Sequence, residues 1–223
     1  MARPRSPLLS RERIVGAALA LVDAEGLPAL STRRLAAELG VSGPSLYNHF
    51  ATKDALLDAV VDHVVGEVDL TMWQAPGGGA PNGGWALALF AWARSYRAAL
   101  VAHPNLVPVL AQGPGRRANA LRLADAVFGG LVDAGWPKGD ATRIGALMRY
   151  FVFGSALGSF AAGFVDDQQV YSEDYPHLGE AHLLADRRRQ VDEGAFEAGL
   201  AALVEGLAAQ YGRLPQSDQP GPG

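Results

Sequence analysis

Apolar residues recur with a helical period along most of the chain. Between residues 11 and 24 they fall on one face of a helix with 3.6 residues per turn. Ser10 precedes this stretch as a candidate cap, and Gly26 follows it where a left-handed residue would end the helix. No segment alternates with the period of two that marks a strand, so the sequence predicts an all-α fold. The first predicted helix buries Ile14, Ala17, Ala18, Leu21 and Val22.

Three shorter helices are predicted next. Ser31 or Thr32 begins the second helix, which ends at Gly40 in a turn that favours a positive φ. Ser42 begins the third helix, and Thr52 begins the fourth. The apolar stripe of the fourth helix is two residues wide, so this helix is expected to pack on two sides. The stripe consists of Leu56, Leu57, Val60, Val61, Val64, Val65 and Val68.

The rest of the chain has longer helical patterns. A glycine-rich loop at residues 77–84 precedes them, and residues 166–182 are polar and irregular, with a short helix expected after Pro176. A three-helix head and a larger helical body are therefore predicted. Long helices are expected at residues 84–102, 116–134, 137–164 and 193–211; the predicted parts are a basic flexible arm at 1–9, a head domain at 10–57, a body domain at 58–213 and a disordered tail at 214–223.

Composition narrows the class of protein. Of the 223 residues, 49% are hydrophobic and 19% charged, which allows a packed core. Cysteine is absent, which excludes disulfides and thiolate metal sites. The apolar stretch at residues 150–165 is 16 residues long, short of the ~20 that span a bilayer. Residues 1–7 lack the apolar run of a secretory signal, so we expect a cytoplasmic protein with no membrane partner.

Charge is unevenly distributed between head and body. Residues 1–53 carry seven Lys and Arg against four Asp and Glu, a net charge of +3. The remaining residues carry 12 Lys and Arg against 19 Asp and Glu, a net charge of −7. A basic head on an acidic body indicates that the head, rather than the body, meets phosphates.

Residues 31–50 read as a helix, a tight turn and a second helix. Leu46 and Phe50 are expected to anchor the second helix to the core, while its polar residues stay exposed. Serine and asparagine reach base edges in a DNA major groove, and neighbouring basic or hydroxyl side chains meet phosphates. Helix-turn-helix pairs also occur in proteins that never touch DNA, so the pattern alone leaves both interpretations open. The candidate DNA contacts are Thr32, Arg33, Ser42, Gly43, Pro44, Ser45, Tyr47, Asn48, His49 and Lys53.

The motif resembles the DNA-binding head of the TetR family of one-component transcriptional regulators over about residues 10–65. A weaker similarity to the tetracycline-repressor branch continues into the body. The resemblance implies a homodimeric repressor that binds a palindromic double-stranded DNA operator and is released by a small-molecule effector held in the body. The matching segments are 14–26, Gly40, 42–50 and 52–57 in the head, and Trp85, 92–100, 157–158 and 166–168 in the body.

The body departs from the tetracycline repressor where that prototype holds its drug and metal. Asp69, Trp92, Leu110 and Gly154 stand near those places. A tetracycline–magnesium chelate is therefore not expected. The sequence favours a larger, more apolar effector, or a different pose of the ligand. Each candidate for the ligand-binding cavity is also a plausible core residue. The candidates are Leu89, Trp92, Tyr96, Leu110, Leu123, Val127, Met148, Phe151 and Ser155.

The resemblance also implies a four-helix dimer interface, made of two helices from each copy. The predicted helix at 137–164 offers small residues four positions apart, Gly154 with Gly158 and Ser155 with Ser159. The alternative is that both helices belong to the core of a single chain. The other helix, at 193–211, offers Phe196, Leu200, Leu203, Val204, Leu207 and Tyr211 on one face.

No catalytic, metal or cofactor site is predicted. His177 and His182 are five residues apart, off a shared helical face, and no Ser/His/Asp spacing stands out. Two alternatives to a repressor stay open. One is a transcriptional activator of the same fold, and the other is an all-α small-molecule-binding protein or enzyme that has lost DNA binding. Salt-dependent, sequence-selective DNA binding distinguishes a regulator from the latter.

Overall fold

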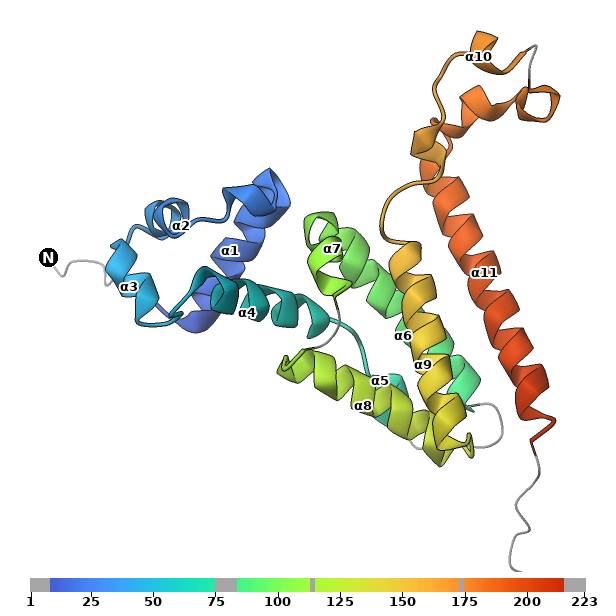
Figure 1. The fold of residues 1–223 in the computed structure, drawn as a ribbon, viewed down its shortest axis with the longest axis horizontal. Coiled ribbons are helices and arrows are strands. Elements are labelled where there is room, and N and C mark those ends of the chain that lie inside the picture. Colours follow the sequence, from blue (N-terminus) through green and yellow to red (C-terminus); the bar gives the residue numbers. More distant parts are fainter. Residues whose placement is uncertain (1–8, 75–83, 113–114, 173–174, 215–223) are drawn as a thin grey trace, which may run out of the picture. The chain divides into compact units, whose positions relative to one another are not determined.

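The computed structural model describes residues 9–74, 84–112, 115–172 and 175–214 (Figure 1). Within these residues every regular element is a helix, so the predicted all-α fold is confirmed. Residues 1–8 of the predicted arm, 77–83 of the predicted loop and 215–223 of the predicted tail lie outside the described residues. The α-helices are α1 (Arg11–Glu25), α2 (Thr32–Leu39), α3 (Gly43–Tyr47), α4 (Lys53–Val65), α5 (Thr71–Gln74), α6 (Gly84–Ala102), α7 (Val107–Leu110), α8 (Ala118–Asp133), α9 (Lys138–Gly154), α10 (Gln169–Ser172) and α11 (Arg188–Tyr211).

Contacts divide the chain into two compact units that do not follow chain order. Unit 1 contains the chain up to Leu70, together with Ser95–Asp125 and Tyr150–Leu157. Unit 2 contains Thr71–Arg94, Ala126–Arg149 and the residues from Gly158 onward. Helices α1 to α4 therefore share unit 1 with parts of α6, α8 and α9. The predicted domain boundary between residues 57 and 58 stays a prediction.

Side-chain caps start the helices of the head where the sequence predicts them. The hydroxyl oxygens of Ser10, Ser31 and Thr52 accept hydrogen bonds from the backbone N–H three residues on, at 3.2, 3.2 and 3.0 Å. Ser42 precedes α3 without such a bond. Its hydroxyl oxygen lies 2.7 Å from that of Ser45 instead.

Two glycines end the first two helices with different backbone conformations. Gly40 has φ 65° and ψ 33°, the left-handed conformation predicted for the turn between α2 and α3. Gly26 also has a positive φ, 82°, but its ψ is 169°. The prediction of a left-handed cap at Gly26 is therefore wrong, because the ψ of Gly26 is that of an extended residue. The chain then enters a short 3-10 turn at Leu27–Ala29.

Helix α1 packs on α2 and α4, and α2 packs on α3 (Figure 1). Of the face predicted for α1, Ala17 is only half-buried, whereas Val15 and Leu19 are buried in addition. Leu57 of α4 is also half-buried. The stripe of α4 otherwise lies in the core as predicted, although Val68 follows the end of the helix. The buried side chains of the head include Ile14, Ala18, Leu21, Val22, Leu35, Leu46, Phe50, Leu56, Val60, Val61, Val64, Val65 and Val68.

The long helices of the body differ from their predicted bounds by more than two residues at two ends. The helix predicted over 137–164 ends at Gly154, ten residues early. Its end coincides with the Ser155 hydroxyl donating to the Val152 carbonyl at 2.7 Å, which competes with the backbone ladder beside a low-propensity glycine. Gly158 and Ser159 are therefore not on α9, and the predicted spacing of small residues along one helix is wrong. At the other end, α11 begins at Arg188, before the predicted residue 193.

The apolar face of α11 packs within its own chain. Tyr211 contacts the rings of Trp85 and Trp136, with ring centroids 5.4 and 5.2 Å away, and its hydroxyl donates to the carbonyl of Ala134. The prediction that this face forms a dimer interface is therefore wrong, since the core of unit 2 covers it. Phe196, Leu200, Val204 and Leu207 are buried, and Leu203 and Tyr211 are half-buried.

Replacing Gly130 by alanine is expected to destabilise the protein by about 1–3 kcal/mol. A Cβ atom at Gly130 on α8 would lie 2.1 Å from Cε3 of Trp73, whose side chain is buried on α5. Gly129 is the matched control, because a Cβ there meets nothing within 4 Å. Gly129→Ala should stabilise by about 0.8–1 kcal/mol through helix propensity. Urea unfolding of both variants measures the difference, and equal stabilisation would contradict the packing described.

Candidate DNA interface

The polar face of α3 is exposed above a buried support. Leu46 and Phe50 are 4% and 5% exposed and hold the helix to the core, as predicted. None of the ten predicted DNA contacts is buried, and the Tyr47 side chain is 56% exposed. Arg33, Ser42, Pro44, Tyr47, Asn48 and Lys53 are exposed, and Thr32, Gly43, Ser45 and His49 are half-buried.

The residues predicted to meet phosphates come from three helices. The Thr32 hydroxyl at the start of α2 lies 3.5 Å from the Tyr47 hydroxyl at the end of α3. Thr32, Tyr47 and Lys53 also line one hollow of about 20 Å³. Arg33 lies on the exposed side of α2. Hydroxyl and ammonium donors are thus placed beside α3, where backbone phosphates flank a helix in the major groove.

The start of α1 reaches the end of α3, a contact that the sequence did not predict. Arg11 donates from Nη1 to the backbone carbonyl of His49, and its Cζ lies 4.1 Å from the centre of the Phe50 ring. The pKa of the neighbouring Glu12 is lowered, first by a hydrogen bond with its own backbone N–H and then by the Ser10 hydroxyl. Arg11 and His49 are 38 residues apart, so no local pattern links them.

A histidine joins the ends of α1 and α4 to the segment after α6. Nδ1 of His103 lies 2.8 Å from Oδ2 of Asp23, and Nε2 lies 3.5 Å from Oε2 of Glu67. The Asn105 amide donates to the carbonyls of Val22 and Asp23 at 2.9 and 3.3 Å. These contacts, also missed from the sequence, tie the head helices to α6 and α7 within unit 1.

Helix α4 also caps the N-terminus of α8. The Asp62 carboxylate accepts hydrogen bonds from the backbone N–H groups of Asn119 and Ala120 at 2.9 and 3.2 Å. One turn earlier on α4, Asp58 accepts from two nitrogens of Arg117 at 2.7 and 3.0 Å. An anion at a helix N-terminus is stabilised by unpaired N–H groups, so α8 is anchored to α4.

The predicted ligand-binding residues lie on α6 to α9 and just after α9. Those on α6 to α8, with Met148 on α9, are buried, while Phe151 and Ser155 are half-buried. These residues are divided between the two compact units, so the ligand-binding site stays a prediction. Leu89, Trp92, Val127 and Met148 belong to unit 2, and Tyr96, Leu110, Leu123, Phe151 and Ser155 belong to unit 1.

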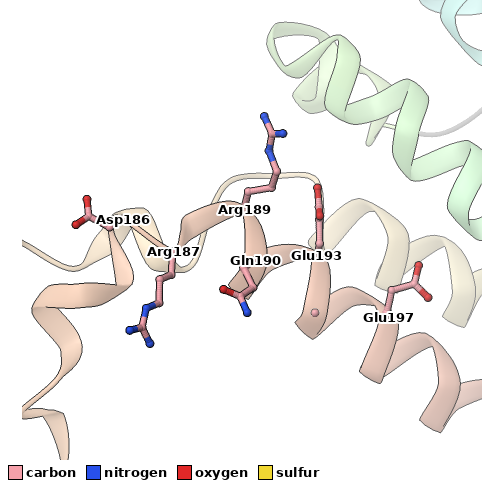
Figure 2. Close-up of a pocket in the computed structure, with 7 residues that line it drawn as sticks. Asp186, Arg187, Arg189, Gln190, Glu193 and Glu197 are labelled. Carbon is pink, nitrogen blue, oxygen red and sulfur yellow. The ribbon is translucent and has the colours of Figure 1, made fainter.

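A hollow of about 550 Å³ lies along the start of α11, outside the predicted ligand residues. It is lined by charged and polar side chains from Asp186 to Glu197. Figure 2 shows Arg187 and Arg189 pointing in opposite directions rather than toward a common point. Glu197 is already engaged by Arg94, whose pKa is raised by their hydrogen bonds at 2.7–3.2 Å. These features do not form a pocket for an apolar effector.

Neither a metal-binding cluster nor a membrane-spanning helix is found in the described part of the chain. No three histidine, aspartate or glutamate side chains there gather closely enough to hold a metal ion. Within the same residues, none of the helices combines the length and the apolar character needed to cross a membrane.

A short helix after a tight turn, supported by a three-helix core and exposing its polar face, is the architecture of a helix-turn-helix head. A family model described as bacterial regulatory proteins of the tetR family matches residues 14–60. A second model, described as the tetracyclin repressor-like C-terminal domain, matches residues 78–211. The chain therefore belongs to the TetR family and is a DNA-binding transcriptional regulator.

Full-length relatives are similar over most of their length. The class C tetracycline repressor of Escherichia coli is 36% identical, over 89% of this chain and 90% of its own. A possible TetR family regulator from Streptomyces coelicolor has a TM-score of 0.71 at 35% identity, over 90% of this chain and 99% of that chain. ActR from the same organism, solved in complex with actinorhodin, has a TM-score of 0.70 at 31% identity, over 92% of this chain and 100% of that chain.

Proposed function

We propose that the chain is a repressor that binds an inverted-repeat operator as a homodimer and is released by a small, largely apolar effector. The observation that carries the proposal is the exposed polar face of α3 above the buried side chains of Leu46 and Phe50. A regulator of this kind acts on chromosomal DNA, so we place the protein in the cytoplasm.

In the proposed complex, α3 lies in the major groove and its exposed side chains read bases. The amide of Asn48 can pair with both N6 and N7 of adenine, and Ser45 with several bases. Thr32, Arg33, Tyr47 and Lys53 surround α3 and bind phosphates, which positions the head without reading sequence. Ser42, Gly43, Pro44 and His49 complete the surface that faces DNA.

The homodimer is supported by exposed surfaces on α9 and α11. Helix α9 exposes Leu147 by 40% and Tyr150 by 71% on one face. On α11, with 100° per residue, the exposed small residues lie opposite the buried face. Small side chains let helices of two copies approach closely, and a two-fold axis would place two α3 helices one DNA turn, ~34–36 Å, apart. The small residues are Ala195, Ala198, Ala202, Gly206 and Ala209.

Release by an effector is supported by the contacts that tie α4 to the body. An effector held by the predicted residues on α6 to α9 would shift helices that Asp62 and His103 join to the head. Such coupling between two sites is typically worth about 1–3 kcal/mol, or about 5–150-fold in affinity. The solved complex of ActR with actinorhodin supports a ligand-responsive regulator, because that similar protein binds a ligand.

A reporter gene behind the promoter of the chain's own gene tests the sign of regulation. If the chain is a repressor, reporter output rises when the gene is deleted and falls when it is restored. An activator gives the opposite change and would contradict the proposal. A variant with the exposed α3 residue Asn48 replaced by alanine is the control, since it should behave as the deletion does.

Substituting alanine for Lys53 should weaken binding to every DNA sequence alike. The loss of one phosphate contact per subunit is expected to lower the slope of log affinity against log salt by about 0.9 per subunit. Lys138→Ala, which removes the exposed lysine at the start of α9, is the matched control. Titrations of labelled duplex at several salt concentrations measure both slopes, and an unchanged slope for Lys53→Ala would exclude this phosphate contact.

A further inference from the structure

Arg11 makes two contacts with the residues that follow α3. Its guanidinium lies over the ring of Phe50, with Cζ 4.1 Å from the ring centre, and Nη1 donates to the carbonyl of His49. Arg11 is itself exposed, as the first residue of α1, while Phe50 is buried. One side chain thus holds both the buried anchor and the backbone at the end of the DNA-facing helix.

Helix α3 needs such support because it is only five residues long. A helix of this length is unstable in water, and its last carbonyl groups have no partner within the helix. The N–H groups of His49 and Phe50 both donate to the carbonyl of Leu46, at 3.0 Å each. The Arg11 guanidinium donates to the carbonyl of His49, two residues beyond the end of α3, and places a positive charge near the helix C-terminus, where a cation is favoured.

The planar guanidinium is suited to this place, whereas lysine is not. Stacking on an aromatic ring and donating sideways to a carbonyl use the flat shape of the arginine head group. A lysine ammonium keeps the charge but does not stack in this way or offer the same fork of donors. Replacing Arg11 by lysine therefore tests whether the role of Arg11 depends on the flat shape of its guanidinium or only on its positive charge.

We infer that Arg11 is a positioning residue for DNA reading: it fixes the end of α3, and with it Asn48 and His49, at the depth and angle needed to meet bases. This inference rests on the proposed function. It differs from a direct phosphate contact, in which Arg11 would bind DNA by charge and leave base reading untouched. The two roles predict different changes in affinity for specific and random DNA.

Arg11→Lys is expected to lower the ratio of operator affinity to random-duplex affinity about 5-fold or more, because base contacts are misplaced. The salt slope should stay within about 0.9 of the wild-type value, since the lysine retains the charge. The probe is a duplex selected by the wild-type chain from a random pool. Arg34→Lys is the matched control, since Arg34 lies on α2 and pairs at 2.7 Å with Glu25 of α1 rather than with a residue of α3. Titrations are made at a temperature where all variants keep wild-type helix content.

A double-mutant cycle with Phe50→Leu tests the contact even if Arg11→Lys weakens the head. This change removes the ring but keeps an apolar anchor, so Arg11→Lys should cost less specificity in the Phe50→Leu background than in the wild type. Additive effects would overturn the inference. So would an Arg11→Lys chain with unchanged specificity. If the wild-type chain selects no sequence from the pool, the proposed function itself fails, which is a separate outcome.

Discussion

Alanine in place of Asn48 is expected to weaken operator binding about 30-fold or more while leaving random-duplex binding unchanged. A base contact of this kind is worth about 1–3 kcal/mol, and a homodimer loses it in both half-sites, so the total is about 2–6 kcal/mol. Asn48 is exposed at the end of α3, and no buried packing is lost with its side chain. The salt slope should not change, because the number of phosphate contacts is unaltered.

Fluorescence anisotropy with the selected operator and with a scrambled duplex measures this difference. Gln190→Ala is the control, since it removes an exposed amide from the start of α11, outside the helix-turn-helix. Variant operators altered at one base pair identify the position that Asn48 reads, because the mutant protein should no longer distinguish bases there. Equal weakening on both duplexes would show that Asn48 does not read bases.

Arginine in place of Ala202 should separate the proposed dimer and weaken operator binding about 100-fold or more. A bulky, charged side chain would stand in the middle of the exposed small-residue stripe of α11, where the partner helix is proposed to approach. The fold of the single chain should survive because Ala202 is exposed and lies opposite the buried Leu200 and Val204. Two linked heads bind about 10²–10⁴-fold more tightly than one, and this gain would be lost.

Light scattering after gel filtration measures the mass of each variant, and anisotropy measures its operator affinity. Ala208→Arg makes the same change at an exposed position of α11 outside the stripe, so it should leave both properties unchanged. A dimeric Ala202→Arg chain with wild-type affinity would show that α11 does not form the interface. A monomeric wild-type chain that still binds its operator tightly would contradict the dimer itself.

The head could be predicted from the sequence because its signals are local. Ser10, Ser31 and Thr52 accept hydrogen bonds from residues three positions away, so the caps and the first turn can be seen together in the sequence. The exposed face of α3 follows equally from the spacing of Leu46 and Phe50. The role of Arg11 could not be predicted, because its partners are 38 and 39 positions away and depend on how α1 crosses the head.

The body is harder to predict, because an amphipathic pattern shows that one face of a helix is buried but not which segment or chain covers that face. The pattern on α11 correctly indicates that Phe196, Leu200 and Val204 are buried, but they pack in their own chain and not against a second copy. The end of α9 coincides with a side-chain hydrogen bond from Ser155 to the Val152 carbonyl, which the apolar pattern does not show. The contact of His103 with Asp23 and that of Asp62 with Asn119 join residues 80 and 57 positions apart, beyond any local signal.

Selection of bound sequences from a random duplex pool by the purified chain tests the central claim most directly. We expect enrichment of an inverted repeat whose half-sites are centred about 10 base pairs apart, with the enriched bases lost for the Asn48→Ala chain. No enrichment at physiological salt, or a single unrepeated site bound by one chain, would contradict a homodimer that reads DNA through α3.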